Sequence, residues 1–119
     1  MKLLTENRSD YIEAIQNIDL RFLIAPFGFE LNGFEESALQ IITKPQFEPT
    51  HYRRWQIKTN NKIHAKLAIG TKGVIVGSWN FTNNSTQNAH ECSIVIYKED
   101  DPKIIESCTE YFKKIWERT

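Results

Sequence analysis

The chain has 119 residues, which is enough for one domain with a modest buried core and too few for two. Hydrophobic residues make up 40% of the sequence and charged residues 25%, so a disordered chain, a collagen and a coiled coil are excluded. The 15 basic residues balance the 15 acidic ones, which excludes a strongly basic coat for nucleic acid but leaves room for a local basic site.

The first half of the chain predicts one helix and several strands. Ser9 is a candidate N-cap, and apolar residues at helical spacing predict a helix over 9–18. Dense or alternating apolar runs predict strands over 20–25, 39–43 and 52–58, with proline- and glycine-containing loops between them. Asn60 and Asn61 are a turn signal of the hairpin kind.

The second half predicts three more strands and a long helix. Two strands, 62–69 and 74–78, are expected to pair through a tight turn around Gly70 and Gly73. A β-branched run predicts a strand over 91–97, and Pro102 begins an amphipathic helix that extends to about residue 117. We therefore expect an α/β domain with five or six strands in a mixed sheet and two flanking helices.

Four polar side chains are expected to converge on one pocket if the strands over 62–69 and 74–78 pair through their turn. Alternation along a strand places His64 and Lys66 on one face, and Ser78 and Asn80 also share a face. A neutral imidazole can attack phosphorus, while an ammonium group and neutral donors can hold the non-bridging oxygens of a phosphodiester. The chain offers no carboxylate cluster for Mg²⁺ and no Cys/His pattern for zinc, so we expect no metal and no cofactor.

These residues resemble the HKD motif of the phospholipase D superfamily, and in particular its small single-motif bacterial endonucleases. The resemblance rests on His64-x-Lys66, on Gly77-Ser78-x-Asn80 and on Glu91, eleven positions after Asn80. It implies a phospholipase D-like fold for a single domain over residues 1–119. One departure is Thr71, which stands five positions after Lys66 where the family has its aspartate. That aspartate is viewed as structural in the family, so its loss weakens the motif more than the chemistry, yet it leaves an inactive relative open.

The resemblance also implies a mechanism. The superfamily needs two HKD motifs for one active site, and this chain has one, so two copies are expected to pair as a homodimer. His64, Lys66, Ser78, Asn80 and Glu91 are the expected catalytic set, with one His64 forming a phosphohistidine intermediate. Glu91 would orient a histidine, as the carboxylate of a catalytic triad does.

The expected substrate is nucleic acid, with DNA favoured and RNA left open. Arg53, Arg54 and Trp55 form the basic-aromatic cluster of the chain and are candidate substrate-binding residues, although an edge strand with one buried aromatic face explains them as well. Phospholipid is less expected, because no interfacial amphipathic helix with a basic face is evident. The absence of a long apolar run and the two unpaired cysteines favour a cytoplasmic protein that is not in a membrane.

Two alternatives stay open beside the enzyme. The chain could be a non-catalytic binding or regulatory module that kept the HKD fold, which the missing aspartate and the neutral charge favour slightly. It could also be a nuclease subunit that needs a larger partner for DNA binding.

Overall fold

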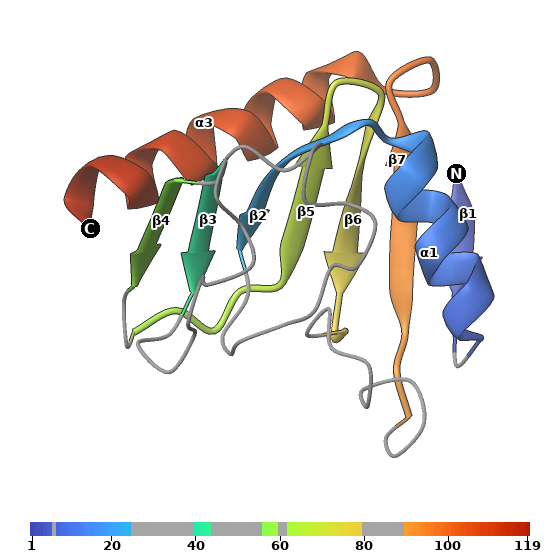
Figure 1. Ribbon diagram of the computed structural model, residues 1–119. Coiled ribbons are helices and arrows are strands. Elements are labelled where there is room, and N and C mark those ends of the chain that lie inside the picture. The colour runs from blue at the N-terminus through green and yellow to red at the C-terminus, as the bar shows by residue number, and fades with distance from the viewer. Residues whose placement is uncertain (6, 25–39, 44–55, 60–61, 80–89) are drawn as a thin grey trace.

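The computed structural model describes residues 1–5, 7–24, 40–43, 56–59, 62–79 and 90–119 (Figure 1). Within these residues, seven strands form one mixed sheet in the order β1-β7-β6-β5-β2-β3-β4. The neighbouring pairs β1–β7, β7–β6, β6–β5 and β5–β2 are antiparallel, and β3 and β4 run parallel to β2. The strands are β1 (Lys2–Leu4), β2 (Leu20–Ile24), β3 (Gln40–Thr43), β4 (Gln56–Thr59), β5 (Leu67–Gly70), β6 (Gly73–Gly77) and β7 (Ser93–Tyr97).

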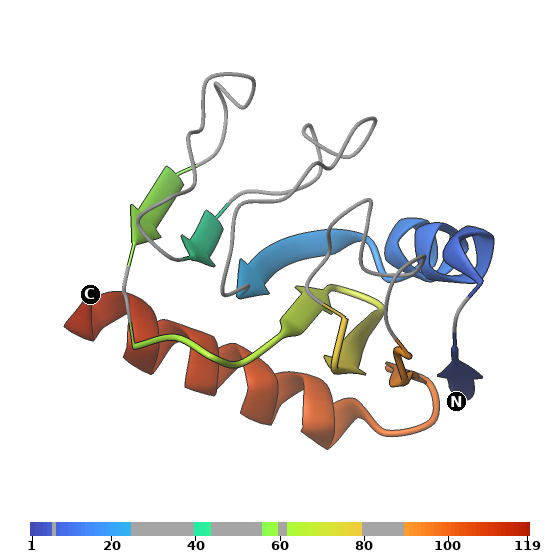
Figure 2. The same ribbon diagram turned by 90° about the horizontal axis from the view of Figure 1, so that it is seen from below.

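Two helices cover opposite faces of this sheet, as the view from below makes plain (Figure 2). Helix α1 (Arg8–Asn17) packs Tyr11 and Ile15 against one face, together with Ala68 of β5. Helix α3 (Pro102–Arg118) packs Ile105 and Phe112 against the other face. The predicted α/β architecture with a mixed sheet and flanking helices is therefore confirmed.

Both helices begin at a capping side chain. The Asn7 side chain accepts a hydrogen bond from the Ser9 N–H at 3.0 Å, so Asn7 caps α1, and the prediction of Ser9 as the cap was wrong by two residues. The Asp101 carboxylate accepts from the Ile104 N–H at 3.3 Å, and Pro102 occupies the first turn of α3 as predicted.

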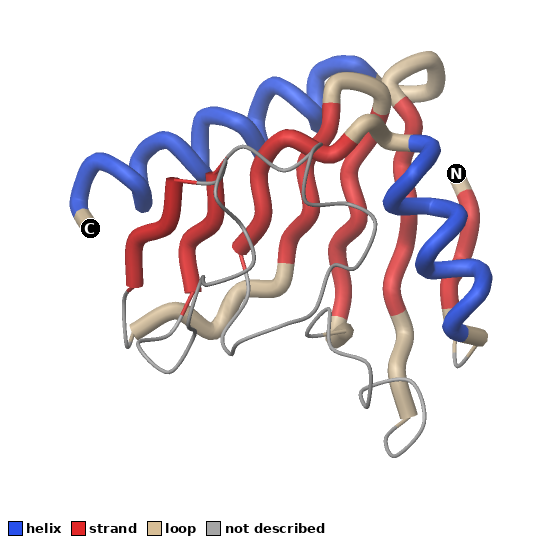
Figure 3. The backbone as a smooth tube through the Cα atoms, viewed as in Figure 1, coloured by secondary structure: helices blue, strands red, loops and turns tan. Residues whose placement is uncertain are grey.

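Three features of the sheet differ from the sequence prediction. The edge strand β1 was not predicted, because three residues give too short a pattern to recognise. The hairpin expected at Asn60–Asn61 was wrong: β4 pairs with β3 in parallel, whereas β5 lies between β2 and β6. Finally, the ladder of β5 begins only at Leu67, so residues 63–66 approach it as a loop segment (Figure 3).

No helix in the described part of the chain is long and apolar enough to cross a membrane.

Candidate active site

The predicted site residues that the structure describes are His64, Lys66, Ser78 and Glu91. They lie at one edge of the sheet, where β5 begins, β6 ends and β7 begins (Figure 1). The last ladder pairs at this edge are Leu67 with Val76 and Gly77 with Ser93. Lys66 lies directly before β5, and Ser78 directly after β6. Because neighbouring strands are about 5 Å apart, the polar residues just beyond these pairs belong to one continuous edge. We call it the motif edge.

The Ser78 hydroxyl of the motif edge is hydrogen-bonded to the segment that leads into β7. Its Oγ donates to the Glu91 carboxylate at 2.5 Å and accepts from the Cys92 N–H at 3.0 Å. The Ser78 N–H in turn donates to the Cys92 carbonyl at 3.1 Å. Glu91 is buried, with 9% of its surface exposed, whereas Ser78 is exposed. The buried carboxylate therefore lies behind a hydroxyl that faces solvent.

The residue before Ser78 has to be a glycine. A Cβ atom at Gly77 would come within 2.2 Å of the Ser93 Oγ and 2.4 Å of the Cys92 carbonyl oxygen. Contacts that short do not occur in folded proteins, so β6 and β7 approach closely here only because position 77 carries no side chain. This approach brings Ser78 within reach of Glu91.

His64 and Lys66 lie on the loop segment that leads into β5. Ile63, Ala65 and Leu67 belong to the cluster packed against α3, so alternation turns His64 and Lys66 away from that core, as predicted. His64 is exposed and Lys66 is half-buried. The Lys66 Nζ donates to the His64 backbone carbonyl at 2.8 Å, which ties the two residues together locally.

The motif edge rests on α1 through an aromatic contact that the sequence did not predict. The rings of Tyr11 and Trp79 lie 4.4 Å apart between centroids, and both residues are buried. The Tyr11 hydroxyl donates to the Leu4 carbonyl at 3.1 Å, and burial raises the pKa of this phenol. Trp79 therefore belongs to the core cluster that packs against α1.

Thr71, which replaces the motif aspartate, lies at the other end of β5 from His64 and Lys66. Its Oγ1 donates to the Asp19 carboxylate at 2.6 Å, and Asp19 also pairs with Arg21 at 3.2 Å. The Thr71 hydrogen bond, with help from Arg21, lowers the pKa of Asp19. A carboxylate is therefore present beside position 71, although it comes from the start of β2 and not from the motif.

Four predicted site residues lie outside the described part of the chain: Asn80, Arg53, Arg54 and Trp55. Their roles stay predictions.

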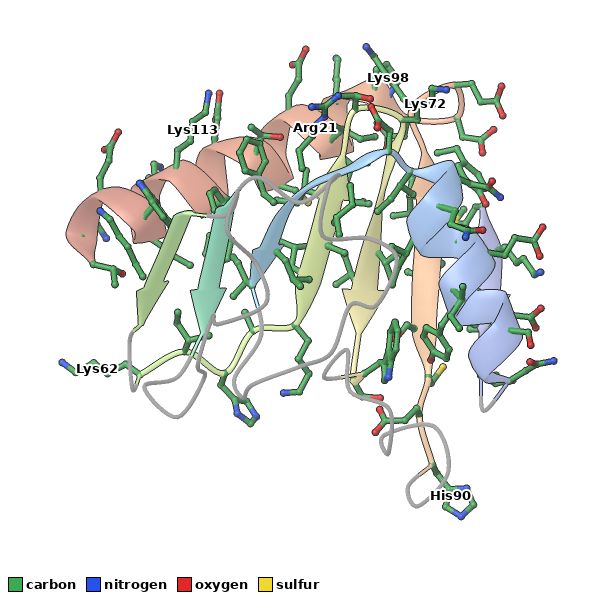
Figure 4. The ribbon with its side chains drawn as sticks, viewed as in Figure 1. Arg21, Lys62, Lys72, His90, Lys98 and Lys113 are labelled. Atoms are coloured by element: carbon green, nitrogen blue, oxygen red, sulfur yellow. The ribbon has the colours of Figure 1, made fainter. Side chains whose placement is uncertain are left out.

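In the described ranges, no group of three or more His, Cys, Asp or Glu side chains is arranged to hold a metal ion. Figure 4 shows Lys62 and His90 at the end of the strands that carries the motif edge, which is the lower end in this view. Arg21, Lys72, Lys98 and Lys113 project at the upper end.

The fold and the motif edge together define a phospholipase D-like domain. The sequence matches the family described as cardiolipin synthase, PLD-like domain, over residues 7–116, and the chain therefore belongs to this family. The resemblance recognised in the sequence is confirmed. No curated protein matches the sequence closely enough to add to this assignment.

Solved structures with the same fold include two bacterial proteins. Nuc from Salmonella typhimurium, a phospholipase D family member, has a TM-score of 0.69 and 16% identity, covering 98% of this chain and 94% of its own. NucT from Helicobacter pylori has a TM-score of 0.70 and 20% identity, with the same coverage of 98% and 94%. TrmBL2, an archaeal chromatin protein with a novel mode of DNA binding, has a TM-score of 0.63 and 12% identity, covering 99% of this chain and 53% of its own. At these identities the likeness establishes the shared fold.

Proposed function

We propose that this chain is a phosphodiesterase that cleaves nucleic acid, DNA in the first instance, through a phosphohistidine intermediate and without a metal ion. The observation that carries the proposal is the convergence at the motif edge. His64 and Lys66 come from the start of β5, and the Ser78–Glu91 pair comes from the adjoining ends of β6 and β7. Membership in a phospholipase D-like family supports a hydrolase of phosphodiesters.

The proposed reaction has two displacements at phosphorus. A nitrogen of neutral His64 attacks the phosphorus atom, the bond to the leaving oxygen breaks, and the second histidine of the site gives that oxygen its proton. The second histidine, now neutral, then takes a proton from a water molecule that attacks the same phosphorus. The phosphorus–nitrogen bond breaks, which releases a phosphate monoester and restores His64.

The other residues would stabilise charge or hold position. Lys66, with Asn80 and the Ser78 hydroxyl, is proposed to contact the non-bridging oxygens, whose negative charge grows in the transition state. Glu91 is proposed as a positioning residue, since its carboxylate already holds Ser78. Arg53, Arg54 and Trp55 are proposed to contact the phosphates and bases on either side of the cleaved bond.

The mechanism needs two histidines, and one chain supplies one His64 at the motif edge. We therefore propose a homodimer in which the partner subunit's His64 is the acid and base. At the start of the reaction one imidazole would be neutral, as the nucleophile, and the other protonated, as the acid.

The decisive experiment measures cleavage of plasmid and single-stranded DNA in excess EDTA. We expect the wild-type chain to cut, His64→Ala to lose activity by 1,000-fold or more, and His90→Ala to keep it within about two-fold. His90 is a matched control, because it is also an exposed histidine on the same side of the sheet. Hydrolysis of phosphatidylglycerol vesicles is measured in the same conditions, for comparison with DNA cleavage. Activity that EDTA abolishes, or that His64→Ala retains, would refute the proposal.

The second candidate function is a nucleic-acid-binding module without catalysis, or a subunit that acquires activity from a larger partner. It is favoured by Thr71 in place of the motif aspartate and by the shared fold with TrmBL2, a chromatin protein that binds DNA. Sedimentation and a DNA-binding assay distinguish the two. A monomer that binds DNA without cleaving it, and whose DNA affinity is the same after His64→Ala and in EDTA, would support the binding module.

A further inference from the structure

A cavity of about 600 Å³ opens at the edge of the sheet opposite the motif edge. Its walls come from the end of α1, the β5–β6 turn, the segment after β7 and the start of α3. The lining residues are Asn17, Lys72, Tyr97, Lys98, Glu99 and Pro102. This volume lies within the range of small-molecule sites, roughly 300–1,000 Å³. We call it the Lys72–Lys98 cavity, and both lysines project on that side of the molecule (Figure 4).

The two lysines are cross-strand neighbours. Gly73 pairs with Tyr97 at the end of the β6–β7 ladder, and the Lys98 N–H donates to the Lys72 carbonyl at 2.9 Å one residue further on. Side chains opposite each other in an antiparallel pair are about 5 Å apart at Cβ, and like charges there are destabilising. Neither ammonium group forms an ion pair in the described part of the chain. A bound anion would remove this repulsion.

The acidic side chains near the two lysines are mostly engaged elsewhere. Asp19 accepts from Thr71 and pairs with Arg21, and the charge of Lys72 is the weakest influence on it. Asp100 pairs with the Met1 ammonium group at 2.8 Å, and Asp101 caps α3. Among the lining residues that the structure describes, Glu99 is the carboxylate beside two lysines, so the net charge of this described lining is positive.

The remainder of the lining suits a planar group. Tyr97 is half-buried and packs against the core on the α1 side, which holds its ring in place at the cavity wall. Pro102 adds a rigid apolar surface at the start of α3. Aromatic rings bind nucleobases by stacking, which contributes about 1–3 kcal/mol per base. The cavity is also far larger than a phosphate ion requires.

We propose that the Lys72–Lys98 cavity binds a nucleotide, with its phosphate between the two ammonium groups and its base against Tyr97. Asn17 and Glu99 face the same cavity and can hydrogen-bond the sugar or the base edge. This site is independent of the proposed nuclease, because it lies at the opposite ends of β5 and β6 from His64 and Lys66.

Calorimetric titration of the full chain tests the proposal, with AMP, adenosine, ribose 5-phosphate and inorganic phosphate as probes. We expect AMP to bind at least ten-fold more tightly than any of the three fragments. Lys98→Glu should weaken AMP binding at least ten-fold. Tyr97→Leu should weaken AMP binding about five-fold and leave phosphate binding unchanged. Lys114→Glu is the control, because it makes the same charge change at an exposed position of α3 outside the cavity.

Two further variants separate this site from the motif edge and from misfolding. His64→Ala should bind AMP as the wild type does, and Lys98→Ala, with thermal melting alongside, checks that the loss in Lys98→Glu is not a loss of fold. AMP affinity that is unchanged in Lys98→Glu, or lost in His64→Ala, would overturn the proposal. So would inorganic phosphate binding as tightly as AMP.

Discussion

The two ends of the β5–β6 strand pair differ in how their polar side chains are hydrogen-bonded and exposed. At the motif edge, a buried carboxylate supports an exposed hydroxyl, and His64 faces solvent nearby. At the opposite edge, the polar groups of Thr71, Asp19 and Arg21 are engaged with one another. The first arrangement leaves the Ser78 hydroxyl and His64 exposed, whereas the second holds the turn beside the Lys72–Lys98 cavity in place.

This comparison explains why the missing aspartate need not remove the chemistry. In the written motif, position 71 follows Lys66 closely, but β5 carries it to the other edge of the sheet. There the Asp19 carboxylate stands beside Thr71. The substitution therefore alters the turn between β5 and β6 and leaves the motif edge unchanged.

The largest difference between the two edges should appear when one lysine is removed from each. Lys66→Ala should lower the rate of DNA cleavage by about 100-fold or more, because it deletes a cation that would face the transition state. Lys98→Ala should stay within about two-fold of the wild type. Initial rates of plasmid nicking in EDTA measure both. Equal losses would mean that the two edges do not differ in function.

Glycine substitutions probe the close backbone contacts of each edge. A Cβ at Gly70 would lie 1.8 Å from the Ile18 carbonyl oxygen, and a Cβ at Gly77 would lie 2.2 Å from the Ser93 Oγ. Each alanine variant should destabilise the fold by about 2 kcal/mol or more in urea unfolding. When corrected for unfolded protein, Gly77→Ala should also slow cleavage, while Gly70→Ala should not. Ser107→Ala, at an exposed position of α3, is the neutral control.

A double-mutant cycle tests whether Asp19 stands in for the motif aspartate. Thr71→Asp alone places two carboxylates where Oγ1 and Oδ2 are now 2.6 Å apart, and it should cost roughly 1 kcal/mol. Asp19→Asn should restore most of that loss, since the amide can donate to the new carboxylate. Asparagine also tolerates the positive φ of 55° at position 19. Additive effects in urea unfolding would contradict the pairing, and cleavage should be unchanged in all three variants.

The smallest expected effect is a pH dependence at the Asp19 side. The pKa of Asp19 lies below its usual value of 3.8, because Thr71 donates to its charged form and Arg21 lies beside it. Its contribution to stability is therefore fully present above that value and disappears as the pH falls through the lowered pKa. The melting-temperature difference between the wild type and Asp19→Asn should shrink between about pH 5 and pH 2. The shift should be slight, since 39% of the Asp19 side chain is exposed. A difference that stays constant over this range would mean that Asp19 does not titrate as described.

Much of the motif edge follows from local patterns. Alternation along an extended chain turns His64 and Lys66 to one side, whether or not the residues form a ladder, so the prediction held although β5 begins later than expected. The Gly77–Ser78 step was recognised from its resemblance to the family motif, whereas the close approach of β7 that requires glycine at position 77 became evident only in the structure. Asn80, Arg53, Arg54 and Trp55 lie beyond the described residues, and their roles rest on the sequence alone.

Contacts between distant segments could not be predicted in this way. Tyr11 showed only the helical spacing of a core residue, and nothing nearby indicates that its ring meets Trp79. The partnership of Thr71 with Asp19 joins residues 52 positions apart. The Asn60–Asn61 turn signal was misleading because strand pairing depends on the whole sheet, which placed β4 beside β3 and β5 beside β2.

The sequence was sufficient to predict the family, from the spacing of the motif residues, and the α/β class, from the succession of expected strands and helices. It also predicted the side on which His64 and Lys66 lie, because side chains alternate along an extended chain. Only the folded chain shows that Asp19 lies beside Thr71, that α1 and α3 both contribute to the Lys72–Lys98 cavity, and that α1 packs against the motif edge. Those features depend on strand order and register, which are set by burial of the two sheet faces under α1 and α3 and are not encoded in any single stretch of the chain.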